Sequence, residues 1–360
     1  MQQALRLAAK GTYTTAPNPN VGCVIAHQGR VVGQGWHQRA GQAHAEVLAL
    51  AQAGAQACGA TAYVTLEPCS HTGKTPPCAD ALIVAGVKRV VVAMQDPNPL
   101  VAGKGLQKLA QQGIEVECGI LSAQARALNP GFIQRMEQGR PFVRVKLGMS
   151  LDGRTAMASG ESQWITAEAA RRDVQFLRAG SSAILTGVDT VIADNPSMNV
   201  RLSSDELGIT GAVRQPLRVV VDSRLRTPLD AKIITLPGQC WLVTGEQAIR
   251  QTSHDRGYLK VVKTSQGHID LTALMRLLAD AQINLLHVEA GSHLCGALLQ
   301  AQLVDEMILY VAPVIMGDDA RGLFSLPGLT KMQDRIQLKL TEVRNVGQDL
   351  RIRARVSNRI

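Results

Sequence analysis

The sequence predicts two consecutive α/β domains. A chain of 360 residues exceeds the size at which a single hydrophobic core usually suffices. Strand-like apolar runs alternate with helix-like periodic segments, and the alternation is interrupted by a stretch that contains Asn129-Pro130-Gly131 and ends at Gly139-Arg140-Pro141. We therefore expect a first domain over 1–120, a helical connector over 121–141 and a second domain over 142–360.

Within the first domain, short runs rich in Val and Ile predict strands, and runs of Ala and Leu at three- and four-residue spacing predict helices. A Gln28-Gly29 turn separates the first two strands. The expected strands are 21–28, 30–36, 61–67, 88–94 and 114–117, and the expected helices are 45–54, 79–86 and 105–112.

The same alternation resumes in the second domain. The stretch from Asp194 to Gln215 is long and polar, as loops that carry function often are. The strand-like and helix-like segments are, in order, 142–150, 169–180, 182–187, 216–223, 240–245, 271–281, 283–291, 293–301 and 304–317.

Composition argues against several classes of protein. No apolar run approaches the roughly 18 residues of a membrane span, and the first residues lack the apolar core of a signal peptide, so we expect a cytoplasmic protein without membrane association. Aromatic residues make up 3% of the chain and the net charge of +9 is spread over both halves, which favours anionic small molecules over nucleic acid. An odd count of seven cysteines argues against a disulfide scaffold.

The segment TLEPCSHTGKTPPC, residues 65–78, contains Cys69 and Cys78. Together with His44 they provide one imidazole and two thiolates, a typical three-ligand zinc set that leaves a fourth position open for water. One alternative is a structural zinc site that His37 or His71 closes as a fourth ligand. A redox pair is the other alternative, although the C-x-x-C spacing is absent.

Glu46 favours a catalytic site, because it is an acid/base group beside the ligands without being one of them. Residues two apart in a helix point about 200° apart, so His44 and Glu46 converge only if His44 stands at the helix entrance. The apolar periodicity, which begins at Val47, allows this. Cys78 follows two prolines at a helix start, where the helix dipole lowers the pKa of a thiol.

Zinc nucleobase deaminases combine H-x-E with P-C-x-x-C, whereas eight residues separate the two cysteines here. The first 120 residues closely resemble the deaminase domain of bacterial bifunctional riboflavin-biosynthesis deaminase/reductases, in which this insertion is the usual form. The motifs that carry the resemblance are PNPNVGCVI, G-x-G-x-H, HAEVLAL, TLEPCSHTGKTPPC and MQDPNPLVAGKG. The segments VKLGMSLDGRTA, SGESQWIT, DTVIADNPSMNVR and VEAGSHLCGALL resemble the family's reductase domain.

The resemblance implies a cytidine-deaminase-like three-layer α/β/α domain followed by a dihydrofolate-reductase-like α/β domain. It also implies hydrolytic deamination of 2,5-diamino-6-(5-phosphoribosylamino)pyrimidin-4-one, with Glu46 as the acid/base and one Zn²⁺ per chain on the three ligands. NADPH then reduces the ribosyl chain to give 5-amino-6-(5-phosphoribitylamino)uracil. Phosphorylated pyrimidines are the expected partners, and a homo-oligomer is expected.

The resemblance further implies binding residues at the matching positions. The deaminase substrate positions are Asn20, His37, His71, Lys74, Asp96 and Asn98, of which His71 and Lys74 suit a phosphate unless Lys74 is only a solvated loop charge. The reductase substrate positions are Ser162, Arg178, Met198, Arg201 and Glu289, with Lys146 near the transferring carbon. The cofactor positions are Gly148, Trp164, Thr190, Asp194, Ser223, Gly291, Ser292, His293, Leu294, Cys295, Gly296 and Ala297.

Cofactor choice has its own signal. Asp222 alone would suggest a ribose-binding acid and NADH, whereas Ser223, Arg224 and Arg226 suit the 2′-phosphate of NADPH.

Two rival functions stay open. One is a nucleotide or nucleic-acid deaminase with an unrelated second domain, and the other is a zinc-stabilised module that senses a flavin precursor without converting it.

Overall fold

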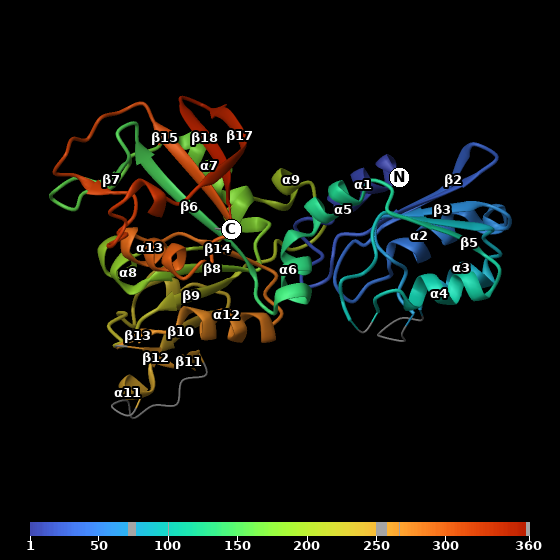
Figure 1. Cartoon of the computed structure of the whole chain (residues 1–360), viewed down its shortest axis with the longest axis horizontal. Helices are drawn as coiled ribbons and strands as arrows, with labels where there is room; N and C mark the ends of the chain where they lie inside the picture. The colour runs from blue at the N-terminus through green and yellow to red at the C-terminus, as the bar shows by residue number, and fades with distance from the viewer. Residues whose placement is uncertain (71–76, 100, 250–257, 266, 358–360) are drawn as a thin grey trace. The chain divides into compact units, whose positions relative to one another are not determined.

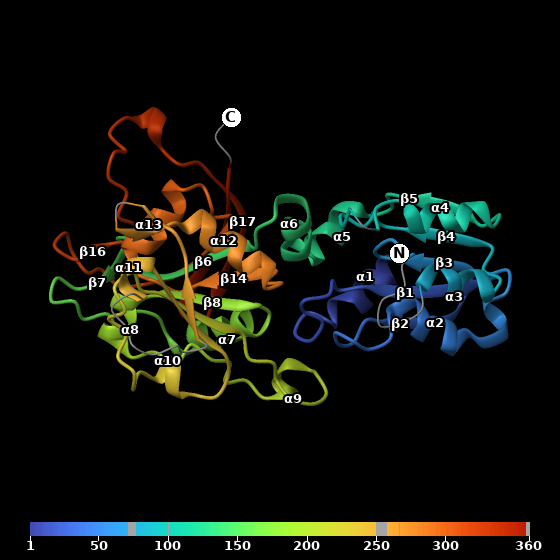
Figure 2. The ribbon, with the colours of Figure 1, turned by 90° about the horizontal axis from the view of Figure 1, so that it is seen from below.

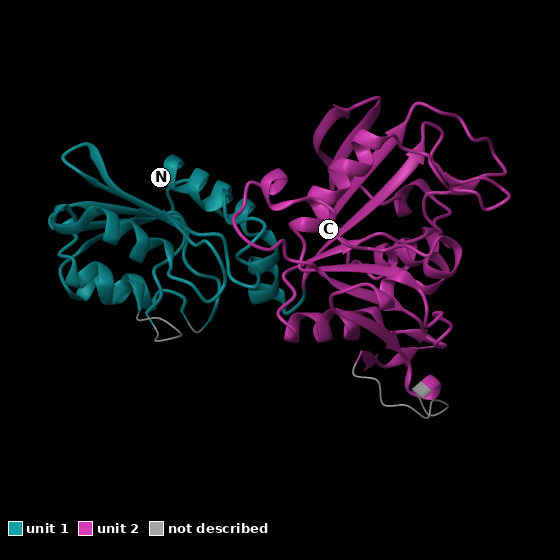
Figure 3. Cartoon of the chain, turned by 180° about the vertical axis from the view of Figure 1, so that it is seen from behind, with its two compact units in different colours: residues 1–140 teal, residues 141–360 magenta. Residues whose placement is uncertain are grey.

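The computed structural model describes residues 1–70, 77–99, 101–249, 258–265 and 267–357. The chain divides into two compact units, Met1–Arg140 and Pro141–Ile360, which Figure 3 colours separately. None of the helices in the described part of the chain has the length and hydropathy that crossing a bilayer requires.

Unit 1 is built on one five-stranded sheet. Its strand order is β2-β1-β3-β4-β5, with β1 antiparallel to both neighbours and the last three strands parallel. The elements, labelled in Figure 1, are α1 (Gln2–Ala9), β1 (Gly22–His27), β2 (Arg30–Trp36), α2 (Ala45–Ala53), the 3-10 turn η1 (Gly54–Ala57), β3 (Thr61–Val64), α3 (Cys78–Val84), β4 (Arg89–Val92), α4 (Lys104–Gln111), β5 (Glu115–Cys118), α5 (Ser122–Leu128) and α6 (Pro130–Gln138).

Helices cover both faces of this sheet, because successive strand residues point to opposite faces. Cys23 and Ile25 of β1 face a core that α2, α3 and α4 complete. Val24 faces the other way and packs with Ala4 and Leu7 of α1. The three-layer α/β/α arrangement is confirmed.

The segment that we expected to connect the domains, 121–141, contributes to the core of unit 1. Ala125 of α5 and Phe132 and Ile133 of α6 are buried with Leu5, Leu66 and Met94. The polar and Gly/Pro-containing sequence hides this contact, because only one side of each short helix is apolar.

The helix α2 lies directly on the backbone of β2. A Cβ atom at Gly35 would stand 2.5 Å from the carbonyl oxygen of Ala45, and one at Gly33 would stand 2.2 Å from that of Ala49. No side chain fits in this contact, so glycine is required at both strand positions.

Unit 2 has a nine-stranded sheet in the order β11-β10-β9-β8-β14-β6-β15-β18-β17. The strands from β11 to β15 in this order are parallel, and β18 and β17 close the sheet as an antiparallel hairpin. The elements are β6 (Phe142–Ser150), β7 (Arg154–Ala156), α7 (Glu168–Ala179), β8 (Ala183–Gly187), α8 (Val188–Asp194), α9 (Ser204–Leu207), β9 (Leu217–Val221), α10 (Lys232–Thr235), β10 (Cys240–Thr244), α11 (Glu246–Ile249), β11 (Leu259–Val261), β12 (Thr264–Ser265), β13 (His268–Ile269), α12 (Leu271–Asp280), β14 (Leu285–Val288), α13 (Ser292–Gln300), β15 (Glu306–Ala312), β16 (Arg321–Gly322), the 3-10 turn η2 (Met332–Asp334), β17 (Leu338–Val346) and β18 (Asp349–Val356).

Helices cover both faces of the larger sheet as well. Figure 2 shows α12 and α13 on one face and α7, α8 and α10 on the other. Residues of β6 alternate between these faces, so that Val143, Val145 and Leu147 enter the core under α12 and α13. Lys146 therefore projects to the α7 face, where the candidate reductase residues lie.

Candidate functional site

The three predicted zinc ligands come from three separate elements of unit 1. His44 is the N-cap residue of α2 and has an extended backbone, Cys69 follows β3, and Cys78 is the first residue of α3. His44 therefore stands at the entrance of α2, as the convergence with Glu46 requires. Glu46 lies in the first turn of α2 and hydrogen-bonds with the Cys78 thiol.

The donor atoms fit a tetrahedral zinc ion. His44 Nδ1 lies 3.2 Å from Cys78 Sγ and 3.7 Å from Cys69 Sγ, and the three donor atoms lie within 4.8 Å of one another. Zinc bonds of ordinary length imply about 3.5 Å between the nitrogen and each sulfur and about 3.8 Å between the sulfurs. In the described residues no other trio of His, Cys, Asp or Glu side chains is grouped this closely.

The two thiols do not ionise independently. A hydrogen bond from Cys78, together with His44, lowers the pKa of the Cys69 thiol to about 4. The same hydrogen bond to Cys69 raises the pKa of Cys78, as do burial and the neighbouring Glu46. The two thiols therefore share the first negative charge, and that charge disfavours a second one. The expectation that the helix start lowers the pKa of Cys78 stays a prediction.

Glu46 places a carboxyl group next to the three donor atoms, where it hydrogen-bonds with Cys78. Its side chain is 3% exposed, and burial raises its pKa to about 7. A carboxyl group with a pKa near neutrality can both accept and return a proton at physiological pH.

His37 forms one wall of the cluster. Its ring packs edge-on against His44, with the centroids 5.4 Å apart. Its Nδ1 lies 3.2 Å from the Ala43 carbonyl oxygen, and its Nε2 lies 3.0 Å from Asn18 Nδ2. Burial lowers the pKa of His37, so its neutral ring donates to Ala43 and accepts from Asn18.

Asn18, which contacts His37, is a neighbour of the cluster that sequence reasoning did not single out. The sequence PNPN offers two asparagines, and we expected Asn20 to contact substrate. In the structure Asn20 Oδ1 accepts a hydrogen bond from Thr15 and its Nδ2 donates to the Leu128 carbonyl oxygen, so this side chain ties the loop to α5. Only the position of His37 distinguishes the two asparagines, and no local pattern encodes it.

Asp96 and Asn98 lie after β4, in a segment that runs beside the cysteine-bearing one. The amide of Glu67 donates to the Met94 carbonyl oxygen, and the amide of Asp96 donates to the Glu67 carboxylate. Asp96 Oδ1 accepts from the amide of Asn98 at 2.8 Å. His71 and Lys74 lie outside the described residues.

In unit 2, Arg178 of α7 forms a two-pronged ion pair with Glu289, which follows β14. Arg178 Nε lies 2.6 Å from Glu289 Oε1, and Nη2 lies 3.0 Å from Oε2. Each side chain is 11% exposed. Arg178 also donates from Nη1 to the Asn199 carbonyl oxygen and contacts Met198 Sδ, so it connects α7, β14 and the 195–201 loop.

The side chains around Glu289 keep its carboxyl group ionised. Burial alone would raise its pKa, but Arg178 and His287 outweigh burial and hold the pKa well below its ordinary value. Burial lowers the pKa of Lys146, which Glu289 partly opposes. An ionised carboxylate that is held by a guanidinium can orient polar groups of a ligand on the α7 face.

Six further predicted reductase residues lie on loops, on α8 or on β6 of unit 2. The Arg201 side chain is exposed, and its amide donates to Gln175 of α7. Trp164 is 71% exposed and stacks under the Arg171 guanidinium at 4.6 Å. Gln163 donates to Asp194 at the end of α8, which brings the Ser162–Trp164 stretch to that helix. Thr190 lies on the same helix, and Gly148 of β6 lies against the methyl group of Thr166.

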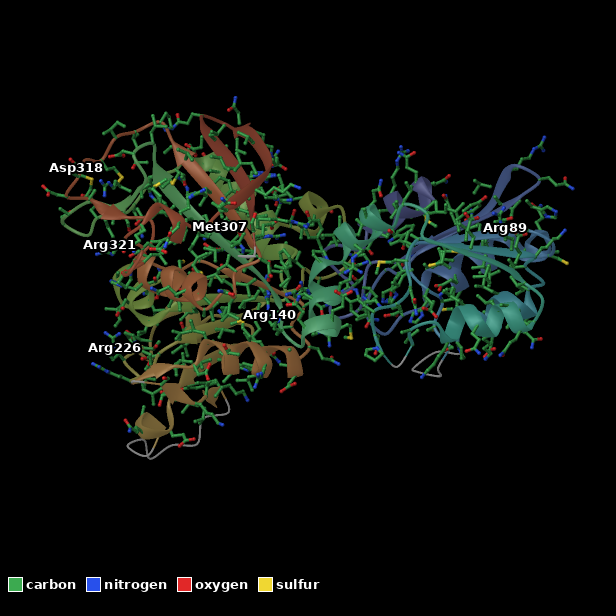
Figure 4. The ribbon with its side chains drawn as sticks, viewed as in Figure 1. Arg89, Arg140, Arg226, Met307, Asp318 and Arg321 are labelled. Carbon is green, nitrogen blue, oxygen red and sulfur yellow. The ribbon has the colours of Figure 1, made fainter. Side chains whose placement is uncertain are left out.

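Asp222 is fully buried and binds its own loop. Its Oδ2 accepts from the amide and the hydroxyl group of Thr227 at 2.7 and 2.6 Å, and Oδ1 accepts from the amide of Arg224. Since these bonds occupy Asp222, a ribose-binding role and the NADH preference that it would imply lose their support. Ser223 and Arg224 stand on the outside of the turn, and Arg226, at the surface in Figure 4, pairs with Asp189.

The seven residues predicted for pyrophosphate differ in their exposure and in their place on α13. Gly291 is the N-cap residue of α13, and it precedes Ser292 and His293 in the first turn, where backbone N–H groups lack helical acceptors. Cys295 and Gly296 instead face the interior, and a Cβ atom at Gly296 would stand 2.1 Å from the Ser325 carbonyl oxygen. Leu294 packs at the edge of the core, and Ala297 is half-buried.

Unit 1 is an α/β/α unit in which one histidine and two cysteines lie at zinc-ligand distances from one another, with a buried glutamate beside them. This combination defines the class of zinc-dependent deaminases. The larger parallel sheet, with its charged pair beside a helix-start loop, suits a nucleotide-dependent reductase. Residues 1–94 match the cytidine and deoxycytidylate deaminase zinc-binding region, and residues 141–352 match the RibD C-terminal domain.

Full-length relatives combine both parts. The chain is 55% identical over 355 residues to the riboflavin biosynthesis protein RibD of Escherichia coli (strain K12), which covers 97% of this chain and 96% of that protein. The Acinetobacter baumannii RibD structure, form 1, superposes with a TM-score of 0.90 at 48% identity, over 99% of this chain and 98% of that one. A Thermotoga maritima diaminohydroxyphosphoribosylaminopyrimidine deaminase/5-amino-6-(5-phosphoribosylamino)uracil reductase gives a TM-score of 0.86 at 31% identity, over 99% and 97% of the chains.

The chain belongs to the RibD family of bifunctional deaminase/reductases of riboflavin biosynthesis. Both activities of the family have a matching unit here, which removes the rival expectation of an unrelated second domain.

Proposed function

We propose that the chain carries out two consecutive reactions on one phosphorylated pyrimidine. The first is hydrolytic deamination of 2,5-diamino-6-(5-phosphoribosylamino)pyrimidin-4-one by residues 1–120, and the second is NADPH-dependent reduction of the ribosyl chain by residues 142–360, with 121–141 between them. The names of the relatives support this substrate, and the donor geometry of His44, Cys69 and Cys78 is the single observation that carries the first step.

The deamination relies on Glu46. Zinc bound to His44, Cys69 and Cys78 would supply Lewis-acid chemistry. Glu46 accepts a proton from the attacking water and returns it to the departing ammonia, and its buried position, which raises its pKa to about 7, suits both transfers. Asn18 and His37 are placed to orient the pyrimidine ring, and Asp96 and Asn98 to hold its polar edge.

The reduction relies on the charged cluster of unit 2. NADPH supplies the hydride, because no side chain is a hydride donor. Glu289 and Lys146 orient the ribosyl hydroxyl groups, and Arg178 keeps Glu289 ionised. Exposed Arg201 takes the phosphate, since the guanidinium of Arg178 is already engaged by Glu289 and Asn199.

The preference for NADPH rests on the turn after β9. Both hydrogen bonds that Thr227 donates to Asp222 lie within the turn, so the carboxylate of Asp222 is already occupied. The neighbouring Ser223 and Arg224 supply a hydroxyl group and a positive charge for the 2′-phosphate. The backbone N–H groups at the start of α13 lack helical acceptors and suit the pyrophosphate.

Three further properties belong to the same proposal. One zinc ion is bound per chain, because one donor cluster is present in the described residues. The chain acts in the cytoplasm, which agrees with seven free cysteines. It forms a homo-oligomer, in keeping with the apolar side chains exposed on the edge strand β17, Leu338, Leu340 and Val343.

The test is incubation with the diaminopyrimidine phosphate and NADPH while both ammonia and the nicotinamide absorbance band are followed. We expect equal amounts of ammonia released and NADPH consumed, and ammonia release alone when NADPH is omitted. Release of ammonia from cytidine or deoxycytidylate in preference to this substrate would contradict the proposal. Binding without turnover would instead indicate a sensor of flavin precursors.

A further inference from the structure

Glu67 is the one charged residue of the TLEPC motif that the proposed reaction does not use. It follows β3, stands two residues before Cys69, and is 4% exposed. Its carboxylate accepts four backbone hydrogen bonds. Oε2 accepts from the amides of Asp96 at 3.1 Å and Gly103 at 2.9 Å, and Oε1 accepts from those of Gly105 at 2.9 Å and Leu106 at 3.3 Å.

Three of these amides belong to the start of α4, where backbone N–H groups have no helical acceptor. The N-cap residue of α4 is Gly103, which has no side chain to cap the helix, and the first turn contains Lys104 and no acidic residue. The carboxylate of Glu67 therefore caps α4 from another element and places a negative charge at the positive end of the helix dipole.

A second, steric observation points to the same docking. A Cβ atom at Gly105 would stand 2.0 Å from the Pro68 carbonyl oxygen, so the start of α4 lies against the backbone next to Cys69. Gly105 and the Glu67 carboxylate depend on each other. The hydrogen bonds from the start of α4 to Glu67 form only because Gly105, without a side chain, lets the helix approach the backbone at Pro68.

The fourth amide links the carboxylate to the substrate residues. The amide of Asp96 donates to Glu67, and Asp96 Oδ1 accepts from the amide of Asn98, so a chain of hydrogen bonds links both residues to Glu67. Cys69 is held separately, because its Sγ accepts from the Cys78 amide and its carbonyl oxygen accepts from the Ala79 amide. The metal donors thus keep their own support when the bonds to Glu67 are lost.

We propose that Glu67 is a positioning residue of the deaminase, which fixes residues 96–99 and the start of α4 against the cysteine-bearing segment so that Asp96 and Asn98 meet the pyrimidine. The inference rests on the proposed function, in which those two side chains contact substrate. It assigns to Glu67 an effect on substrate binding, separate from zinc binding and proton transfer.

The test is Glu67→Gln, which preserves size while one carboxylate oxygen becomes an NH₂ group that faces two backbone N–H donors. Glu115→Gln is the matched control, since Glu115 is 65% exposed and pairs with Arg89, labelled in Figure 4. We expect KM for the diaminopyrimidine phosphate to rise roughly tenfold or more in Glu67→Gln, with kcat within about threefold of wild type. Zinc content and reduction of the deaminated substrate stay at wild-type levels.

Hydrogen exchange gives a readout that does not depend on activity. The amides of Gly103, Gly105 and Leu106 exchange faster in Glu67→Gln by at least about tenfold and are unchanged in Glu115→Gln. Unchanged exchange, an unchanged KM, or loss of zinc from Glu67→Gln would each overturn the proposal. The variant Asp96→Asn distinguishes the proposed substrate contact of Asp96 from the positioning role of Glu67. If KM is unchanged in Asp96→Asn but rises in Glu67→Gln, the substrate contact of Asp96 is refuted and the positioning role of Glu67 stands.

Discussion

Replacing Glu289 with Gln tests the charged cluster of unit 2 most directly, because the amide keeps the shape of the side chain and removes its charge. Arg178 then remains buried without its counter-ion, and Lys146 lies on the same face of the sheet. The two-pronged hydrogen bonding is lost as well, since one of the two oxygens becomes a donor that faces Arg178.

The size of the effect follows from this burial. Both side chains are 11% exposed, so solvent screens the pair only slightly. Removing one partner of a buried pair costs about 3–5 kcal/mol of unfolding free energy. Since 1 kcal/mol shifts the melting temperature of a domain of 150–250 residues by about 2–4 °C, the transition of unit 2 falls by roughly 6–20 °C in Glu289→Gln.

The pH dependence has a definite sign. The pKa of Glu289 lies well below its ordinary value in the folded state, so the ionised carboxylate stabilises the fold at every pH above the unfolded pKa of about 4.3. This stabilisation is lost as the pH falls through 4.3 towards the folded pKa. The difference in melting temperature between wild type and Glu289→Gln is therefore constant above about pH 5 and narrows below about pH 4.

Scanning calorimetry measures this, with the transition of unit 2 identified by the upward shift that we expect from NADPH, the proposed cofactor. Asp318→Asn is the control, because Asp318 is fully exposed at the surface in Figure 4 and pairs with Arg154 at 3.3 Å. Its melting temperature should stay within about 2 °C of wild type. A shift of less than about 3 °C in Glu289→Gln, or the same shift at pH 7 and about pH 3.5, would refute the assignment of a buried ion pair.

Three further substitutions test the two sites. Glu46→Gln retains zinc in elemental analysis but loses deamination by about 10²–10⁴-fold, because an amide cannot carry a proton between water and ammonia. Cys69→Ser loses zinc and ammonia release, yet continues to consume NADPH when it is given the deaminated intermediate, because the reductase residues belong to the other unit. Arg224→Ala lowers the ratio of kcat/KM for NADPH to that for NADH by roughly tenfold, through loss of a charged contact to the 2′-phosphate.

Each of these has a clear contrary result. Activity of Glu46→Gln within tenfold of wild type would assign the proton transfer to another group. Loss of both activities in Cys69→Ser, with circular dichroism unchanged, would indicate one shared site. An unchanged cofactor ratio in Arg224→Ala would move the adenosine pocket away from the turn after β9.

The parts of the fold that could be predicted are those with local apolar periodicity. Strands β1 and β4 of unit 1 and the central parallel strands of unit 2 carry Val- and Ile-rich runs, because they are covered on both faces. Both strands of the hairpin β17–β18 carry charged residues, and β17 is largely exposed, so the sequence of the hairpin has no such apolar run. The contribution of α5 and α6 to the core of unit 1 was equally hidden, since a few apolar side chains per helix do not reveal what they pack against.

The zinc donors could be predicted because their chemistry restricts the residue types, and His44 and Cys69 stand in motifs that few other roles explain. The contacts of Asn18, Glu67 and Arg178 could not, because each depends on partners far along the chain. Glu67 needs the amides that begin α4, and Arg178 needs Glu289 from a strand 111 residues away. Sequence spacing contains no information on such pairings.

The contact of α2 with the glycines of β2 has a consequence for engineering the deaminase. With only backbone between the helix and the strand, no side chain can repack to absorb an added carbon atom, so Gly35→Ala must displace the first turn of α2. His44 and Glu46 move with that turn, although neither touches the substituted residue. Libraries that aim to broaden the range of pyrimidines should therefore hold positions 33 and 35 fixed and place their diversity at Asp96 and Asn98, which follow β4 and so lie on a different segment from His44, Cys69 and Cys78.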